Sequence, residues 1–191
     1  MIQNEKIEVV EEMKIVGYIL RSDLKTCSNT EFIIKKAYGR MWILRRLKAL
    51  GTSRNRLLDV LHKQILSVLN LGVPAWDCLL TEKEKDDFER VLKTGLRIIW
   101  GQDYSTFENI AKECNIRTMR EVREKIVKKF VRKTIKHNKF KRWFSENENT
   151  SMNTRAGNRA RFKPVPARKG FYQKSPIPTL TKLANTLTTH T

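Results

Sequence analysis

The sequence predicts a mainly α-helical protein, with a short N-terminal β-hairpin, a bundle of about five helices and a disordered basic C-terminal tail. Three observations support this fold class. Two β-branched runs open the chain, apolar residues then recur at helical spacing, and capping patterns mark where helices would begin. We expect a hairpin in residues 1–24, a helical domain in 28–144 and a low-order tail in 145–191.

The hairpin is expected within IEVVEEMKIVGYIL, residues 7–20, with Glu11 and Glu12 joining two β-branched runs. Gly17 lies inside the second run. A glycine at such a position predicts a bulge or a close backbone approach.

Four segments match the capping box, in which a hydroxyl accepts from a helical N–H and a Glu reaches back to the cap. They are Ser28–Glu31, Thr81–Glu84, Ser105–Glu108 and Thr118–Glu121. Together with stop signals such as Gly51 and Gly101, they predict helices near 30–50, 53–70, 81–100, 105–114 and 118–140.

The composition changes after Ser145, where Asn, Thr, Pro and Gly become frequent. Residues 151–191 hold eight Lys or Arg and no acid. We interpret this region as a basic, disordered tail, in which IPTLTKLANTL could form one docking turn.

The charge balance is the strongest global signal, because 39 Lys and Arg against 20 Asp and Glu give a net charge of +19. Such an excess favours nucleic acid or another anionic partner over a small-molecule substrate. The N-terminus lacks an apolar signal-peptide core, and the longest apolar stretch is broken by polar residues, so neither secretion nor a membrane partner is expected. The scattered cysteines favour reduced, mostly buried thiols in an intracellular, nuclear or cytoplasmic protein.

Residues 31–50 are the first candidate binding segment. On a helical wheel the core face holds Ile33, Ile34, Ala37, Met41 and Leu44, and the opposite line holds Lys35, Gly39, Trp42 and Arg46. Lys36, Arg40 and Arg45 add positive charge to the same helix. One interpretation is a nucleic-acid backbone approaching Gly39, with Lys35 and Arg46 on phosphates. The other is that Gly39 and Trp42 pack against a neighbouring helix while the charges are solvated.

Residues 118–140 are the second candidate. The pattern predicts a buried stripe of Met119, Val122, Ile126, Val127, Phe130 and Thr134, opposite the basic residues Lys125, Lys128, Lys129, Arg132 and Lys136. Residues 117–142 carry a net charge of +10. A polyanion would relieve the repulsion between them, although a solvated basic helix is also consistent with the pattern.

No catalytic or metal-ligating residue is expected. Asp86 and Asp87 are adjacent, so on a helix their side chains diverge by about 100°. No third carboxylate joins them at a useful spacing, and the chain contains no Walker loop, GxSxG or HExxH.

The order of segments resembles a known family. MKIVGYILRSDL, then TEFIIKKAYGRMWILRRLKALG, then LLDVLHKQILSVLNLGVPAWDCLL, and finally EKDDFERVLKTGLRIIWG resemble the region that follows the palm in reverse transcriptases of LINE-type (non-LTR) retrotransposons. The family pattern runs K-Y-L-G, R-x-W-x-L-R-R-L, P-x-W and E-R-x-x-K. KFKRWF and KSPIPTLTKL also resemble C-terminal segments of the family.

The resemblance implies that Lys14, Ile15, Val16 and Gly17 correspond to the primer-grip hairpin, with Ile15 in place of the family's Tyr. The helices that follow would be the thumb, so that the line of Lys35, Gly39, Trp42 and Arg46 would face an RNA–DNA or DNA duplex. A separate palm or finger segment of the same polymerase would be a protein partner.

The resemblance also implies what this chain does not supply. The family's polymerase aspartates, F/Y-x-D-D, lie upstream of the primer grip and have no match in these 191 residues. Mg²⁺ would belong to that palm. We therefore expect a non-catalytic fragment of an RNA-directed DNA polymerase, inactive alone. The alternative is a small basic helical adaptor that binds nucleic acid or a protein and has no polymerase role.

Overall fold

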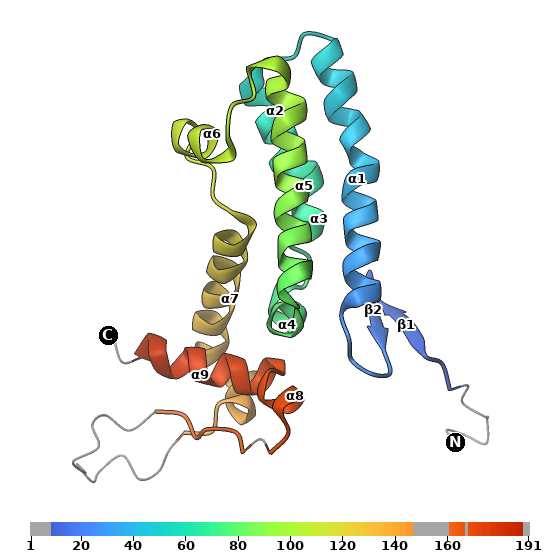
Figure 1. The fold of residues 1–191 in the computed structure, drawn as a ribbon. Coiled ribbons are helices and arrows are strands. Elements are labelled where there is room, and N and C mark those ends of the chain that lie inside the picture. Colours follow the sequence, from blue (N-terminus) through green and yellow to red (C-terminus); the bar gives the residue numbers. More distant parts are fainter. Residues whose placement is uncertain (1–8, 147–160, 167, 189–191) are drawn as a thin grey trace. The chain divides into compact units, whose positions relative to one another are not determined.

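The computed structural model describes residues 9–146, 161–166 and 168–188, and it is mainly helical with a short antiparallel hairpin before the helices (Figure 1). The predicted fold class is confirmed. The chain divides into two compact units. The first unit contains 1–72 and 80–119, and the second contains 73–79 and 120–191. These units do not follow the composition-based regions, because the short segment 73–79 groups with the C-terminal part.

The hairpin consists of β1 (Glu12–Ile15) and β2 (Tyr18–Arg21), with Ile15 opposite Tyr18. The two residues of the turn, Val16 and Gly17, have φ values of 49° and 83°. Positive φ at both central residues is what a tight two-residue hairpin turn requires. The expected link at Glu11 and Glu12 was therefore wrong, and Gly17 forms the turn rather than a bulge.

The five predicted helices are present in the described residues, with one irregularity. The stretch predicted as a helix over 53–70 divides into α2 (Arg54–Val60), a π-helical segment η1 (Leu61–Leu66) and α3 (Ser67–Leu69). The remaining helices of the first unit are α1 (Cys27–Ala49), α5 (Glu82–Trp100), the 3₁₀ turn η3 (Gly101–Asp103) and α6 (Phe107–Glu113).

The core of the first unit lies between α1, α5 and the α2–η1–α3 stretch, which contact one another (Figure 1). The predicted core residues of α1 are buried, except that Ile34 is only half-buried. Burying a large apolar side chain stabilises the fold by roughly 1.5–3 kcal/mol. The fully or nearly fully buried side chains of this core include Ile33, Met41, Leu44, Leu57, Leu61, Ile65, Leu69, Phe88, Val91, Leu92, Leu96 and Ile110.

One predicted capping box forms as expected. Thr81 accepts from the Glu84 amide, and the Glu84 carboxylate accepts from the Thr81 amide at 2.8 Å. Two others are displaced. Ser28 lies inside α1 and donates to the Glu12 carboxylate at 2.6 Å, while Thr106, the residue after Ser105, caps α6. In both cases a residue one or two positions from the predicted one caps the helix. The motif alone does not determine at which residue a helix begins.

The second unit contains the short segments α4 (Val73–Trp76) and η2 (Asp77–Leu79), which contact α9 (Pro176–Thr188). It also contains α7 (Met119–Lys136), apart from its first residue, and the 3₁₀ segment η4 (Asn138–Trp143). The four-residue α8 (Gly170–Gln173) precedes α9.

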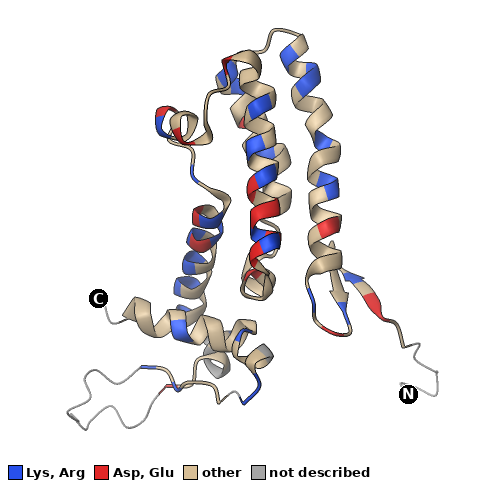
Figure 2. Cartoon of the chain, viewed as in Figure 1, with Lys and Arg blue, Asp and Glu red and all other residues tan. Residues whose placement is uncertain are grey.

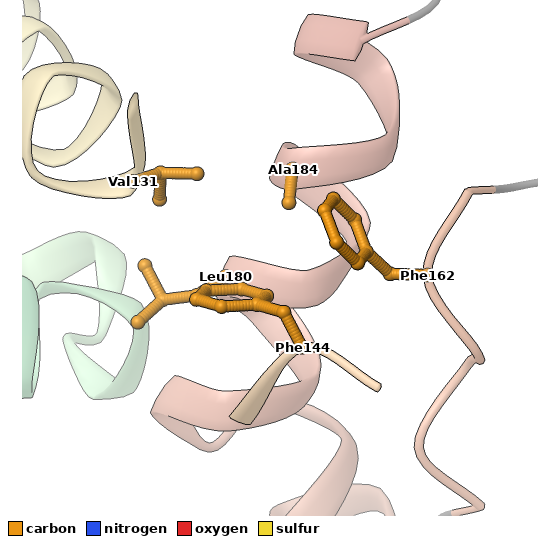
Figure 3. Close-up of a cluster of buried hydrophobic side chains, with 5 residues drawn as sticks. All are labelled: Val131, Phe144, Phe162, Leu180 and Ala184. Atoms are coloured by element: carbon orange, nitrogen blue, oxygen red, sulfur yellow. The ribbon is translucent and has the colours of Figure 1, made fainter. Parts of the chain in front are cut away.

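A hydrophobic cluster forms the core of this unit. Val131 of α7, Phe144, Phe162 and two residues of α9, Leu180 and Ala184, converge on it (Figure 3). The rings of Phe144 and Phe162 lie 5.5 Å apart. These residues come from four separate places in the sequence, so long-range packing holds the unit together.

The C-terminal segment therefore has more structure than the predicted low-order tail. Residues 176–188 form a helix, and the Asn185 amide bonds both backbone groups of Phe162, accepting at 2.8 Å and donating at 3.1 Å. The physical reason is the i, i+4 pair of Leu180 and Ala184, which gives α9 an apolar face to bury. The expected tail between 147 and 160 lies outside the described residues.

The thiols are not mostly buried, contrary to the prediction. Cys27 is exposed, and Cys78 and Cys114 are half-buried. None of the helices in the described part of the chain has the length and apolar character needed to cross a bilayer.

Candidate nucleic-acid interface

The outward face of α1 carries the four residues singled out from the wheel. Lys35, Gly39, Trp42 and Arg46 are all exposed and follow one another at one-turn intervals. Figure 2 shows basic residues repeating along α1, with acid only near its N-terminal end, at Glu31. We call these four residues the α1 face.

The surroundings of Gly39 and Trp42 distinguish between the two interpretations of this helix. A Cβ placed on Gly39 would meet no atom within 4 Å, and Trp42 is 62% exposed. Neither residue is covered by a neighbouring helix of the described chain. Packing against a neighbouring helix of the described chain therefore does not explain the open position of Gly39 or the exposure of Trp42.

The other predicted basic residues of α1 divide into two kinds. Lys36 and Arg45 are exposed, as an interface residue must be. Arg40 is half-buried, and its guanidinium donates to the Gln64 carbonyl of η1 at 2.5 Å. Arg40 thus ties α1 to the π-helical segment, where the backbone bonding pattern is irregular. Lys48, near the end of α1, similarly donates to the Ile98 carbonyl in the last turn of α5 at 2.8 Å.

Tyr38 is a candidate that the sequence analysis missed. It is 40% exposed and lies four residues before Trp42, so the two rings occupy adjacent turns of the same face. Their i, i+4 spacing was a usable signal. Exposed aromatic rings beside cations can stack on bases or sugars, as aromatic side chains do in many single-strand binding sites.

The predicted primer-grip residues occupy the tip of the hairpin. Lys14 and Ile15 end β1, and Val16 and Gly17 form the turn. Lys14 is exposed, and its ammonium lies 4.8 Å from the centroid of the Phe32 ring. The hairpin is attached to α1 through Asn29, whose side-chain oxygen accepts from the Ile19 amide at 3.1 Å.

Helix α7 carries the second candidate surface, and its basic residues are accessible. Lys125, Lys129, Arg132 and Lys136 are exposed, whereas Lys128 is half-buried and pairs with Glu124 at 2.5 Å. A hollow of about 500 Å³ is lined by Glu121, Glu124, Lys125, Lys128, Lys129 and Arg132. Like charges at these spacings destabilise a helix by about 0.2–0.5 kcal/mol per pair.

The buried stripe of α7 is rotated from the predicted one. Met119 and Thr134 are buried as expected, but Val131 is fully buried and Val122, Ile126, Val127 and Phe130 are only half-buried. The unexpected member is Arg123, which is 2% exposed and whose Nε lies 3.1 Å from the Asp77 carboxylate. A pattern that counts only apolar residues cannot detect a buried arginine whose partner lies elsewhere in the chain.

Glu84 is the other buried charged group that the sequence analysis understated. Besides its capping role, its Oε1 accepts from the hydroxyls of Thr26 and Thr30, each at 2.9 Å. Burial by itself raises the pKa of Glu84, but the hydrogen bonds from Thr81, Thr26 and Thr30 outweigh burial and lower it. This carboxylate joins the first turns of α1 and α5 and is structural.

The adjacent aspartates of α5, Asp86 and Asp87, lie in different surroundings. Asp87 pairs with Arg90 at 2.7 Å on the same helix, and Asp86 lies beside it on the exposed surface. Within the described residues, no group of three His, Cys, Asp or Glu side chains could hold a metal ion. Burial raises the pKa of the Cys78 thiol to about 11, which keeps it protonated and weakly nucleophilic at neutral pH.

Comparison with known proteins identifies no relative, since no protein-family model, curated protein or solved structure matches the chain.

Proposed function

We propose that this chain is a thumb-like segment of a non-LTR retrotransposon reverse transcriptase, which holds a template–primer duplex without carrying out the polymerase chemistry. The proposal rests on the resemblance of its segments and on the α1 face. The single observation that carries it is the exposed Gly39–Trp42 pair between Lys35 and Arg46.

Each residue of the α1 face has a distinct role in this proposal. Lys35 and Arg46 contact phosphates on either side of the point of closest approach. Gly39 lets the nucleic-acid backbone come close to the helix, because no side chain stands between them. Trp42 packs against a sugar or base at the same level. Lys36 and Arg45 add long-range attraction, which salt weakens.

The chain contributes binding and no chemical step. Metal-assisted phosphoryl transfer needs carboxylates that hold ions at the reacting phosphate, and the family's F/Y-x-D-D has no match in this sequence. In this proposal, Mg²⁺ and those aspartates belong to a separate palm segment, which is the protein partner. An intracellular location, in the nucleus or cytoplasm, follows from such a role.

The sharpest test is Gly39→Ala. In the free chain this change should stabilise the protein by about 0.5–1 kcal/mol, because alanine favours the helix and the site is open. If a nucleic-acid backbone lies against Gly39, the same methyl group should weaken binding to an RNA–DNA hybrid. Urea unfolding and fluorescence anisotropy at 50 mM salt would measure the two effects.

Two further variants extend this test. Trp42→Ala and the pair Lys35→Gln with Arg46→Gln should also weaken hybrid binding, while Arg56→Gln with Lys112→Gln removes the same charge from exposed positions away from α1. Wild-type log K should fall by about 0.9 per neutralised phosphate as log salt rises on a B-form duplex. The proposal is wrong if the α1 variants bind like the charge-matched control.

The adaptor alternative is favoured by one observation, the apolar surface of the hairpin region. Val9, Val10, Met13, Ile15, Val16 and Leu20 are exposed. Clustered exposed apolar side chains are typical of protein-binding surfaces. Size-exclusion chromatography at high salt, with and without nucleic acid, distinguishes the thumb-like segment from the adaptor. A monomer whose elution volume does not change when nucleic acid is added would favour the adaptor.

A further inference from the structure

A line of cations on α7 forms a surface distinct from the α1 face. We call Lys125, Lys129, Arg132, Lys133 and Lys136 the α7 ridge. All five side chains are exposed. They follow an i, i+4, i+7, i+8, i+11 spacing, which places them along one side of the helix over about 16 Å at 1.5 Å per residue. Figure 2 shows this run of basic residues after the acids at the start of α7.

The ridge keeps an excess of positive charge in the described part of the chain, although Glu121 and Glu124 line the same hollow as Lys125, Lys129 and Arg132. No carboxylate of the described residues forms an ion pair with any of the five residues, and the nearby Glu124 pairs with Lys128 instead. The opposite side of α7 is occupied, because Val127, Phe130, Val131 and Ile135 pack in the hydrophobic cluster of the second unit. The ridge is therefore a fixed row of cations on a helix that its own core holds in place.

The ridge also differs from the α1 face in kind. The α1 face combines cations with Trp42 and an open glycine and has Tyr38 beside it, whereas the ridge consists of Lys and Arg alone. Phe130, the aromatic residue of α7, is half-buried against the cluster. Long cationic side chains contact phosphates, and such contacts position a protein on nucleic acid without reading the bases.

We propose that the α7 ridge is a second nucleic-acid-binding surface, one that binds the phosphate backbone of single and double strands alike. Phosphates along one strand of a duplex are spaced at about 3.4 Å of helix axis, so a ridge of about 16 Å spans roughly five of them. The inference goes beyond the proposed function, because the ridge lies in the other compact unit and needs no thumb geometry.

The test uses the full chain with Lys125→Gln, Lys129→Gln, Arg132→Gln and Lys136→Gln combined. Binding is measured by anisotropy between 50 and 200 mM salt on three probes: a single-stranded DNA, a DNA duplex and an RNA–DNA hybrid. The slope of log K against log salt should become shallower by about 3 on every probe, since each lost phosphate contact removes about 0.7–0.9 from the slope.

The matched control removes four charges from exposed positions outside both surfaces, with Arg56→Gln, Lys83→Gln, Lys112→Gln and Arg117→Gln. Its slope should change by less than 1. Equal slopes for the ridge variant and this control would overturn the proposal. A second control combines Lys125→Arg, Lys129→Arg and Lys136→Arg, which keep the positive charge. Its salt slope should equal that of the wild type, and a shallower slope would count against phosphate attraction as the cause.

Heparin tests whether the ligand is nucleic acid or another polyanion. If the ridge variant loses heparin binding but keeps its nucleic-acid slopes, the ridge serves a sulfated polyanion and the proposal fails. The α1 proposal is judged separately, because Trp42→Ala should change the preference between probes while leaving the salt slope in place. Either of the two proposals can therefore be wrong while the other holds.

Discussion

At the scale of single residues, Val16 has the most costly backbone conformation of the hairpin. Its φ is 49° and its side chain is 91% exposed, so no packing compensates for the strain. A left-handed conformation costs an L-residue roughly 1–2 kcal/mol, and a β-branched side chain tolerates it poorly.

We predict that Val16→Asn stabilises the hairpin by up to about 1 kcal/mol, because asparagine accepts positive φ and suits such a turn. Amide hydrogen exchange across 12–21 measures the effect. Gly17→Ala should act in the opposite direction. Its Cβ would lie at an ordinary 3.6 Å from Leu71, so the loss comes from the backbone at a φ of 83°. Faster exchange in Val16→Asn would contradict this account of the turn.

Glu84 contributes to how the first unit responds to acid. Its folded pKa lies below the ordinary value of 4.5, because hydrogen bonds from three threonines outweigh the opposing effect of burial. A carboxyl group with a lowered folded pKa contributes stability above its unfolded pKa. That contribution is therefore present above about pH 4.5 and is lost as the pH falls through the folded value.

We predict that Glu84→Gln destabilises the chain by about 1–3 kcal/mol at pH 7, because buried donors lose a charged acceptor. The difference from wild type should shrink as the pH falls through the lowered folded pKa of Glu84, where the carboxylate itself becomes protonated. Urea unfolding as a function of pH measures the free energy of unfolding of the wild type and of the variant. Glu82→Gln, in the same helical turn but exposed, should change little across the range. If the loss of stability in Glu84→Gln does not change with pH, the Glu84 carboxylate does not stabilise the fold through its ionised form.

How far single residues could be predicted depends on where their partners lie. The Thr81–Glu84 box and the α1 face were accessible from the sequence, since spacing along one helix determines them. The bonds from Thr26 and Thr30 to Glu84, and from Arg40 to Gln64, join residues 24 to 58 positions apart. Helical periodicity contains no information on such pairs, so Arg40 was grouped with the outward cations.

At the scale of helices, two glycines of the first unit have opposite surroundings. Gly39 of α1 is open, whereas a Cβ on Gly95 of α5 would lie 2.4 Å from Cδ1 of the fully buried Leu61. The missing side chain at Gly95 lets α5 approach the π-helical segment closely. Only tertiary structure distinguishes these two positions.

We predict that Gly95→Ala destabilises the chain by on the order of 1 kcal/mol, since overpacking costs about 1–3 kcal/mol and the gain in helix propensity is about 1 kcal/mol. Thermal unfolding measures the loss of stability. Gly39→Ala is measured in parallel, and its unfolding temperature should rise. Adding Leu61→Val to Gly95→Ala should recover part of the loss. If both glycine variants stabilise equally, the close contact of Gly95 with Leu61 is not a constraint.

Helices with long amphipathic patterns were predictable to within a few residues, as α1, α5 and α7 show. The π-helical interruption at 61–66 was not, because the same apolar spacing fits a continuous helix. Helix α9 was expected as no more than one possible docking turn, for a different reason. Its surroundings in sequence are rich in Thr, Pro and Asn, and its few apolar residues become significant only against Val131 and Phe162.

At the scale of the whole molecule, the second unit is assembled from distant parts of the chain. The segment 73–79 belongs to it although the flanking residues belong to the first unit. Trp76 of this segment is fully buried, Asp77 pairs with the buried Arg123 at 3.1 Å, and Cys78 and Thr179 share a hydrogen bond. Since the chain passes from one unit to the other at 72–73, 79–80 and 119–120, neither unit is a contiguous piece of sequence.

This assembly gives the C-terminal helix a structural role that a low-order tail would not have. Leu180→Ala should cost about 2–5 kcal/mol, because it opens a cavity beside Val131, Phe144 and Phe162. Ile177→Ala, on the same helix but 38% exposed, should cost much less. Hydrogen exchange of amides in 120–136 and 176–188 measures the stability of this unit. If neither substitution accelerates exchange, α9 does not support the second unit, and the α7 ridge lies on a helix without a stable core behind it.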